Sequence, residues 1–324
     1  MKIVLSPLLG FYLILVIVII IAISVASPLI IWACLELNIL AFLPIISSEP
    51  GLALENTMKY FLVQRWASIF FLIGLIFSMF ISEHLYLVRL VSLILKLGAA
   101  PFHGWFISIV KRRSIWILTL LSTLQKCTPL IMIIRLKVTI SIISLFMGMT
   151  LIFSYFSLPR TINVNKILAL SSIVNLSWLL VRVQHSLKTF LVFFFIYSSL
   201  LLAVVTICTK YKLTSFKGVN NFRLIDNLIM VFVFMSLGGL PPLLGFLGKL
   251  LILKSVLVYI NYSIALILVY SSLLLLYTYI SRLFFIISNS PRLKIGPRNT
   301  KIRFKISILC SSLVGFNMLI IIPI

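Results

Sequence analysis

Residues 237–249 read LGGLPPLLGFLGK and lie between two strongly apolar stretches. Neither Pro241 nor Pro242 can donate a backbone hydrogen bond, so a helix that reaches them leaves the carbonyls of Leu237 and Gly238 without helical partners. Lys249 follows in the same apolar region. We therefore expect a helix that is broken at the prolines and carries a lysine beside the break.

A second stretch has the same character. Residues 95–103 read LKLGAAPFH, in which Gly98 permits a bend and Pro101 removes the donor for a carbonyl one turn earlier. Lys96 stands beside this break, and one span later Lys126 precedes another proline, Pro129. Two interrupted apolar segments in comparable positions of two halves are typical of an inverted-repeat transporter. The alternative is a pair of ordinary proline kinks without a transport role.

The composition places the chain in a membrane. Hydrophobic residues make up 62% of the 324, and only 10% are charged, against about 25% in soluble domains. Such a chain has too much apolar surface for a soluble protein and is too hydrophobic to be disordered. Its net charge of +23 is spread thinly between apolar runs, which argues against binding of nucleic acid.

The apolar runs predict an all-α fold in one transmembrane domain over residues 1–324. A helix needs about 20 apolar residues to cross a bilayer. Charge-free runs cover residues 138–159, 189–209, 255–281 and 306–324, and the run over residues 3–35 is divided at Pro28. Further spans start near Tyr60, Leu90, Ser114, Ile167 and Asn227. The expected total is about eleven helices.

The loops between these spans carry unequal charge. Eighteen Lys and Arg residues fall on the side of the N-terminus and six on the other side. Because basic loops stay on the inner side of a membrane, the N-terminus is predicted inside and, with an odd number of spans, the C-terminus outside. The first segment is expected to be an anchor, since no cleavage site follows it.

Five charged residues remain inside predicted spans: Glu36, Arg65, Lys96, Lys126 and Lys249. Each costs roughly 2.5 to 3.5 kcal/mol at mid-helix. Arg65 is placed about one turn into its span and is interpreted as reaching to the interface. Lysine changes its protonation state readily on burial, whereas arginine stays charged. We therefore expect Lys96, Lys126 and Lys249 to exchange protons, with Glu36 modulating the nearest lysine.

These residues carry a family resemblance. The chain resembles subunit 2 of mitochondrial NADH:ubiquinone oxidoreductase (respiratory complex I), a family of antiporter-like membrane subunits, and the matches run in family order from about residue 31 to 250. The matching stretches are IWACLELNILAFLP (31–44), KYFLVQ (59–64), LKLGAAPFH (95–103), QKCTP (125–129), KILALSSI (166–173) and GGLPPLLGFLGK (238–249).

The resemblance implies a role for each charged residue. Glu36 and Lys96 would form a coupling pair, Lys126 would be the connecting proton carrier, and Lys249 would face the exit side. Two residues depart from the family pattern: Arg65, where a small or neutral residue is expected, and Asn175, where many relatives have a histidine. A neutral amide cannot carry a proton, so that link would run through water or bypass the site.

The resemblance also implies a cellular location and a set of partner subunits. It places the chain in the mitochondrial inner membrane, with the N-terminus on the matrix side and the C-terminus in the intermembrane space, beside other complex I subunits. NADH, FMN, iron–sulfur clusters and ubiquinone would bind to those subunits. This chain has no Gly-x-Gly-x-x-Gly or Walker motif, and its four cysteines lack Cys-x-x-Cys spacing and read as buried apolar residues, so no cofactor or metal is expected here.

Alternative functions stay open at this point. The chain could be another antiporter-like subunit or a component of a cation/proton antiporter, for which an additional intramembrane acid is expected beyond Glu36. It could also be a structural scaffold of the membrane arm, although the retained glutamate and three lysines argue against that interpretation.

Overall fold

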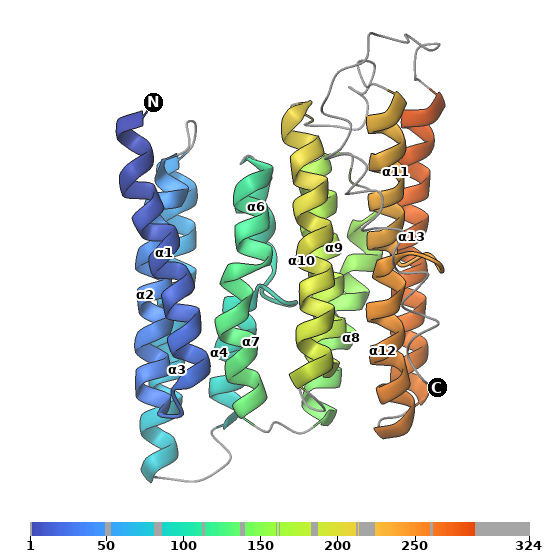
Figure 1. Cartoon of the computed structure of the whole chain (residues 1–324). Coiled ribbons are helices and arrows are strands. Elements are labelled where there is room, and N and C mark those ends of the chain that lie inside the picture. Colours follow the sequence, from blue (N-terminus) through green and yellow to red (C-terminus); the bar gives the residue numbers. More distant parts are fainter. Residues whose placement is uncertain are drawn as a thin grey trace. The chain divides into compact units, whose positions relative to one another are not determined.

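The computed structural model describes residues 2–48, 53–80, 86–111, 114–136, 140–159, 161, 163–182, 187–211, 213, 224–259 and 262–288. These residues form the α-helices α1 to α13, joined by turns (Figure 1). The all-α prediction is confirmed for this part of the chain. The helices fall into two compact units, residues 1–150 and 151–324, with the boundary inside α8 (Ile140–Ser157).

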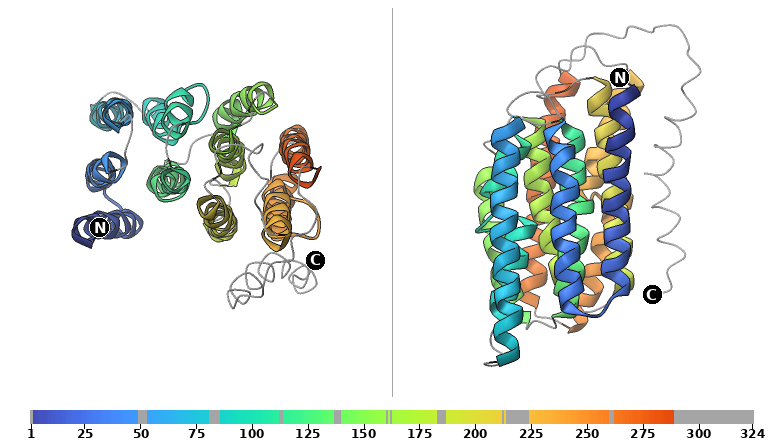
Figure 2. Two further views of the ribbon diagram at one scale, coloured as in Figure 1. Left: turned by 90° about the horizontal axis from the view of Figure 1, so that it is seen from above. Right: turned by 90° about the vertical axis from the view of Figure 1, so that its left-hand side faces the viewer.

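The first unit is built on sequential helix packing. Helix α1 packs against α2, α2 against α3, and α3 against α4, while α7 contacts α1, α2 and α4. Seen from above, α1, α2 and α3 form a row (Figure 2). The helices are α1 (Lys2–Ser24), α2 (Pro28–Ser47), α3 (Ala53–Phe80), α4 (Tyr86–Leu97), α5 (Gly104–Val110), α6 (Ile115–Ser122) and α7 (Leu124–Arg135). The predicted division at Pro28 is confirmed, because proline fits the first turn of a helix.

The second unit is organised around α9. This helix contacts α10, α12 and α13, and its Trp178 is completely buried. The remaining helices pack in pairs, α10 with α11 and α12, and α11 with α13. Their bounds are α9 (Val164–Arg182), α10 (Leu187–Lys210), α11 (Leu224–Gly238), α12 (Leu244–Tyr259) and α13 (Tyr262–Ser288).

Six helical segments in the described part of the chain are long and apolar enough to cross a membrane. They are Pro28–Ser47, Leu54–Ser78, Ile115–Arg135, Val164–Val181, Thr189–Lys210 and Tyr262–Phe284. The expected number of about eleven stays a prediction, and the predicted last span over residues 306–324 lies outside the described residues.

Both predicted helix breaks are present. Helix α4 ends at Leu97 and α5 begins at Gly104, with Gly98 at φ +65° between them. Helix α11 ends at Gly238 and α12 begins at Leu244, with Gly239 at φ +86°. Glycine suits both positions because a Cβ atom disfavours positive φ. Each unit therefore contains a helix that is broken at a glycine and a proline, with a lysine next to the break.

The interruption near Lys126 lies elsewhere than the sequence predicts. Pro129 lies inside α7, and the helix is interrupted at Thr123, whose backbone has φ −114° and ψ −84°. The Thr123 hydroxyl donates to the carbonyl of Thr119 at 2.6 Å. Threonine side chains compete for backbone groups in this way, which favours a break here. Lys126 thus follows its break by three residues.

Candidate functional site

The break between α4 and α5 exposes carbonyls that side chains satisfy. Lys96 lies in the last turn of α4 and is 6% exposed. Trp105 Nε1 donates to the carbonyl of Leu95 at 3.1 Å, and Gln64 Nε2 donates to the carbonyl of Lys96 at 3.2 Å. Two carbonyls in the last turn of α4 are therefore bonded by side chains inside the protein, as irregular backbone at membrane depth requires.

Glu36 binds Arg65 in an ion pair. Arg65 Nη1 donates to Glu36 Oε2, and the two side chains are 34% and 12% exposed. The expectation that Arg65 reaches to the interface from a position near the start of its span is wrong. Helix α3 begins at Ala53, so Arg65 lies about 18 Å along it at 1.5 Å per residue. Near mid-helix the guanidinium needs a partner, and Glu36 provides one.

The ammonium of Lys96 lies near this ion pair. Its Nζ is buried and has no hydrogen-bond partner among the residues that the structure describes. It lies within electrostatic range of both Glu36 and Arg65. Lys96 therefore lies in the field of the Glu36–Arg65 ion pair, but Glu36 bonds directly to Arg65 and not to Lys96. The pairing of Glu36 with Lys96 that the resemblance implies stays a prediction.

A hydrogen-bonded network lies next to Lys126 in the same unit. Tyr60 Oη donates to Gln125 Oε1 at 3.0 Å, Gln125 Nε2 donates to Asn38 Oδ1 at 3.2 Å, and Asn38 Nδ2 donates to Thr128 Oγ1 at 3.1 Å. The network joins α2, α3 and α7. Sequence reasoning did not assign Tyr60, Asn38, Gln125 and Thr128 to the site, although the spacing of Gln125 and Thr128 puts them on one helix face.

Lys126 is held in apolar and aromatic surroundings. It is 3% exposed, and its Nζ lies 5.2 Å from the centre of the Phe106 ring. An ammonium placed over an aromatic face is attracted by the ring quadrupole. Lys126 thus shares the first unit with Glu36 and Lys96, and α7, which carries it, contacts both α2 and α4.

Lys249 contacts the second helix break directly. Its Nζ donates to the carbonyl of Gly238 at 2.7 Å and lies 5.8 Å from the Trp178 ring, with the side chain 4% exposed. This is one of the two carbonyls that the prolines are predicted to free. A Cβ atom on Gly239 would lie 2.8 Å from Lys249 Nζ. Close approach of the lysine therefore requires glycine at this position.

Asn175 lies on α9, one turn before Trp178, and is 2% exposed. It is therefore inside the second unit, as expected for a residue of a polar axis. Ser171 and Ser172, one turn earlier on α9, are equally buried and bond to backbone carbonyls of their own helix.

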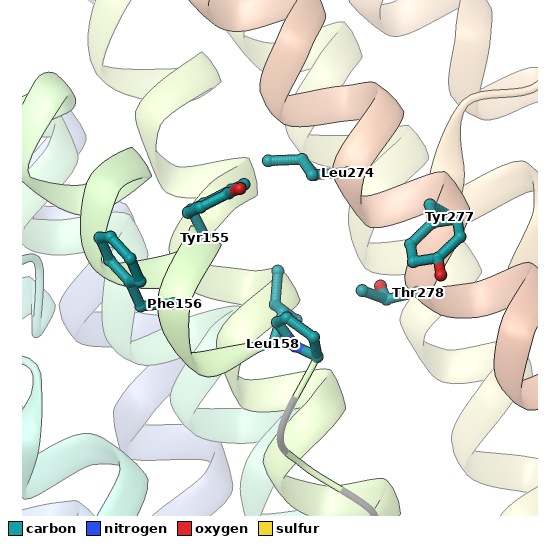
Figure 3. A pocket seen from close by; sticks show the side chains of 7 residues that line it. Tyr155, Phe156, Leu158, Leu274, Tyr277 and Thr278 are labelled. Atoms are coloured by element: carbon teal, nitrogen blue, oxygen red, sulfur yellow. The ribbon is translucent and has the colours of Figure 1, made fainter.

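A cavity of about 370 Å³ in the second unit lies apart from these lysines. It is lined by Tyr155, Phe156, Leu158, Pro159, Leu274, Tyr277 and Thr278. Figure 3 shows Tyr155 and Phe156 of α8, with Leu158 just after it, on one side of this cavity and the residues of α13 on the other. None of the four predicted site residues lines it, and its walls are mostly apolar, so the cavity is not part of the candidate site.

Comparison with known proteins connects this arrangement to a family. The family described as NADH:quinone oxidoreductase/Mrp antiporter, TM, matches residues 77–275. NADH-ubiquinone oxidoreductase chain 2 of Anopheles gambiae is 35% identical over 239 residues, which cover 69% of each chain. Chain 2 of Artemia franciscana is 36% identical over 234 residues, covering 71% of this chain and 74% of the relative. The chain belongs to the NADH:quinone oxidoreductase/Mrp antiporter family.

Solved structures show the antiporter-like fold. A chain of respiratory complex I from Thermus thermophilus with bound aureothin superimposes with a TM-score of 0.78 at 18% identity, covering 94% of this chain and 77% of that one. A chain of the Mrp complex from Dietzia sp. DQ12-45-1b superimposes with a TM-score of 0.73 at 18% identity, over 90% of this chain and 61% of that one. The predicted fold class is therefore confirmed.

The segment that matches the NADH:quinone oxidoreductase/Mrp antiporter family covers only part of the candidate site. Residues 77–275 include Lys96, Lys126 and Lys249. Glu36 and Arg65, which form the ion pair, precede this segment. The lysines thus lie in the part of the chain that the NADH:quinone oxidoreductase/Mrp antiporter family describes.

Proposed function

We propose that this chain is a membrane-arm subunit of NADH:ubiquinone oxidoreductase that contributes to proton translocation across the mitochondrial inner membrane. Its similarity to NADH-ubiquinone oxidoreductase chain 2 from animals supports this assignment. The antiporter-like fold and the apolar helices fit the same function.

Three buried lysines carry the proposal. Lys96, Lys126 and Lys249 are 6%, 3% and 4% exposed within apolar helices, where a charge is expensive and is usually kept for function. Lysine can gain and lose a proton in such surroundings, whereas arginine stays charged. The three side chains are thus chemically suited to hold a proton and pass it on.

Each lysine has a separate task in this proposal. Glu36 modulates the charge of Lys96, Lys126 is the connecting proton carrier, and Lys249 delivers the proton on the exit side. Asn175 cannot carry a proton, so transfer at this point runs through water or bypasses the site. The break at Gly238 supports the exit role, because a polar carbonyl beside a lysine is a place that water can occupy.

The redox chemistry belongs to partner subunits in this proposal. NADH, FMN, the iron–sulfur clusters and ubiquinone bind to other subunits of the complex, and the energy of electron transfer drives proton uptake and release here. This chain takes part in an enzyme that is a proton-translocating oxidoreductase without holding a redox site of its own. The excess of basic residues in one set of loops supports an N-terminus in the matrix and a C-terminus in the intermembrane space.

Replacement of Lys126 tests the proposal. In the intact complex reconstituted into proteoliposomes, Lys126→Ala and Lys126→Arg should both lower the number of protons moved per electron. Alanine removes the carrier, and arginine keeps the charge without releasing a proton. The control is Lys59→Ala, because Lys59 is about half exposed and pairs with Glu55 one turn earlier.

The ratio of protons to electrons separates this function from a scaffold role. A scaffold predicts that all three variants keep the normal ratio as long as the complex assembles, as judged on native gels. A normal ratio in Lys126→Ala would overturn the proposed function.

A further inference from the structure

Arg65 is a charged residue of the first unit to which the proposed function gives no task. It lies near the middle of α3, and its guanidinium lies 5.2 Å from the Phe61 ring and pairs with Glu36. A guanidinium at this depth costs free energy, and charged residues inside membrane spans usually have a function. The contact with Glu36 brings it directly to the predicted coupling pair.

Glu36 has two cations within reach and is bonded to one of them. Its Oε2 accepts from Arg65 Nη1. Lys96 is held beside them, because Gln64, which directly precedes Arg65 on α3, donates to the carbonyl of Lys96 at 3.2 Å. Its Nζ is buried and has no hydrogen bond among the described residues. A carboxylate normally draws a buried ammonium into a direct contact. In this structure Arg65, and not Lys96, makes the direct contact with the Glu36 carboxylate.

Arg65 and Lys96 differ in how readily they lose a proton. Arginine stays protonated in proteins and presents a planar donor group that fits a carboxylate. Lysine can be neutral or charged. A direct bond from Glu36 would hold the proton on Lys96, whereas a carboxylate already neutralised by Arg65 holds it less firmly.

We propose that Arg65 is a positioning residue that competes with Lys96 for Glu36, so that Glu36 alternates between the two cations and Lys96 can release its proton. This inference rests on the proposed function, since it describes how one of the proton-exchanging lysines is controlled. When Glu36 turns to Lys96, the protonated amine is stabilised. When Glu36 returns to Arg65, the amine can lose its proton.

The structure of the variant complex tests this directly. In the Arg65→Gln complex, a cryo-EM map should show the Glu36 carboxylate turned to Lys96, within the roughly 4 Å of a salt bridge. In the unchanged complex, and in Arg65→Lys, at least part of the density should join Glu36 to residue 65. A carboxylate that stays away from Lys96 in Arg65→Gln would overturn the inference.

Proton pumping in proteoliposomes provides the second measurement. Arg65→Gln should slow NADH-driven pumping at least about tenfold, because a close ion pair in a partly buried site is worth more than that factor. Arg65→Lys should keep most of the rate. Arg135→Gln is the control: Arg135 is an exposed arginine of the same unit that donates to the backbone carbonyls of Ile23 and Val25.

A double variant distinguishes this role from a packing role. In a Glu36→Gln background no carboxylate is left to bind Lys96, so Arg65→Gln should add no more than about twofold to the loss. If Arg65 only packed against Phe61, the full loss would persist in that background and the inference would fail. The Lys126→Ala experiment is independent, so the proposed function and this inference can fail separately.

Discussion

Replacement of Gly239 by alanine should disrupt the second helix break. Gly239 has φ +86°, where a residue with a Cβ atom loses about 1–2 kcal/mol. The added Cβ would lie 2.8 Å from Lys249 Nζ and 2.9 Å from its Cδ. The lysine side chain is flexible and will move, but moving breaks its hydrogen bond to the carbonyl of Gly238.

The size of the effect follows from these two terms. A hydrogen bond from a charged group is worth about 1.5–3 kcal/mol, so the variant should lose roughly 2.5–5 kcal/mol of local stability in total. The hydrogen-bond part alone reduces the population of the bound lysine roughly tenfold to a hundredfold, since about 1.4 kcal/mol is a factor of ten. Proton pumping should fall by a similar factor.

The assay is NADH-driven proton pumping in proteoliposomes, normalised to assembled complex on native gels. Gly148→Ala is a matched control in α8, because a Cβ added there meets no atom of the described residues within 4 Å beyond its own helix backbone and chain neighbours. Gly239→Ala combined with Lys249→Met should assemble better than Gly239→Ala alone, since the crowded amine is gone. Normal pumping and assembly in Gly239→Ala would refute this account of the break.

Two further outcomes are expected. Gly245→Ala should prevent assembly, because the added Cβ would lie 1.7 Å from the backbone oxygen of Ser236. The control variant Gly148→Ala should assemble. A native gel that shows normal complex for Gly245→Ala would contradict this prediction. Burial, and next the hydrogen bond to Asp226, raise the pKa of Tyr211 above its usual value of about 10. Since the pKa is raised on folding, protonated Tyr211 favours the folded protein below pH 10, and this contribution is lost as the pH rises through the higher value. Tyrosinate absorbance should therefore differ between the wild type and Tyr211→Phe only above pH 10.

The two proline breaks could be predicted from the sequence because their cause is local. A missing backbone N–H at Pro101 or Pro242 frees a carbonyl one turn earlier in any surroundings. The break at Thr123 could not be predicted in this way. Threonine hydroxyls bond to backbone carbonyls in many helices that are not interrupted. Pro129 was the stronger local signal, and α7 accommodates it in its second turn.

The partner of Arg65 could not be predicted for a different reason. The sequence predicts that this span starts near Tyr60, whereas helix α3 begins at Ala53. That shift of about two turns moves Arg65 from the end of the span to its middle. Its pairing with Glu36 joins residues 29 positions apart, and such contacts depend on how α2 and α3 pack.

The hydrogen-bonded network beside Lys126 could not be predicted from the sequence for the same reason, and its partners lie even further apart in the chain. Asn38 and Thr128 are 90 positions apart, and Tyr60 and Gln125 are 65 apart. Nothing in the spacing of these residues indicates that three helices bring them together. The polar side chains were visible in the sequence, but their partners follow only from tertiary packing.

The two breaks use their lysines differently, and this has a consequence for proton transfer. At the first break neutral side chains bond the carbonyls of Leu95 and Lys96, so the amine of Lys96 is not needed to bond either of them. At the second break Lys249 itself bonds the carbonyl of Gly238. A bond from an ammonium is stronger than one from a neutral amine by about 1 kcal/mol. Loss of a proton from Lys249 therefore loosens the contact between α12 and the end of α11, whereas Lys96 can change its charge without altering the hydrogen bonds of its own helix break.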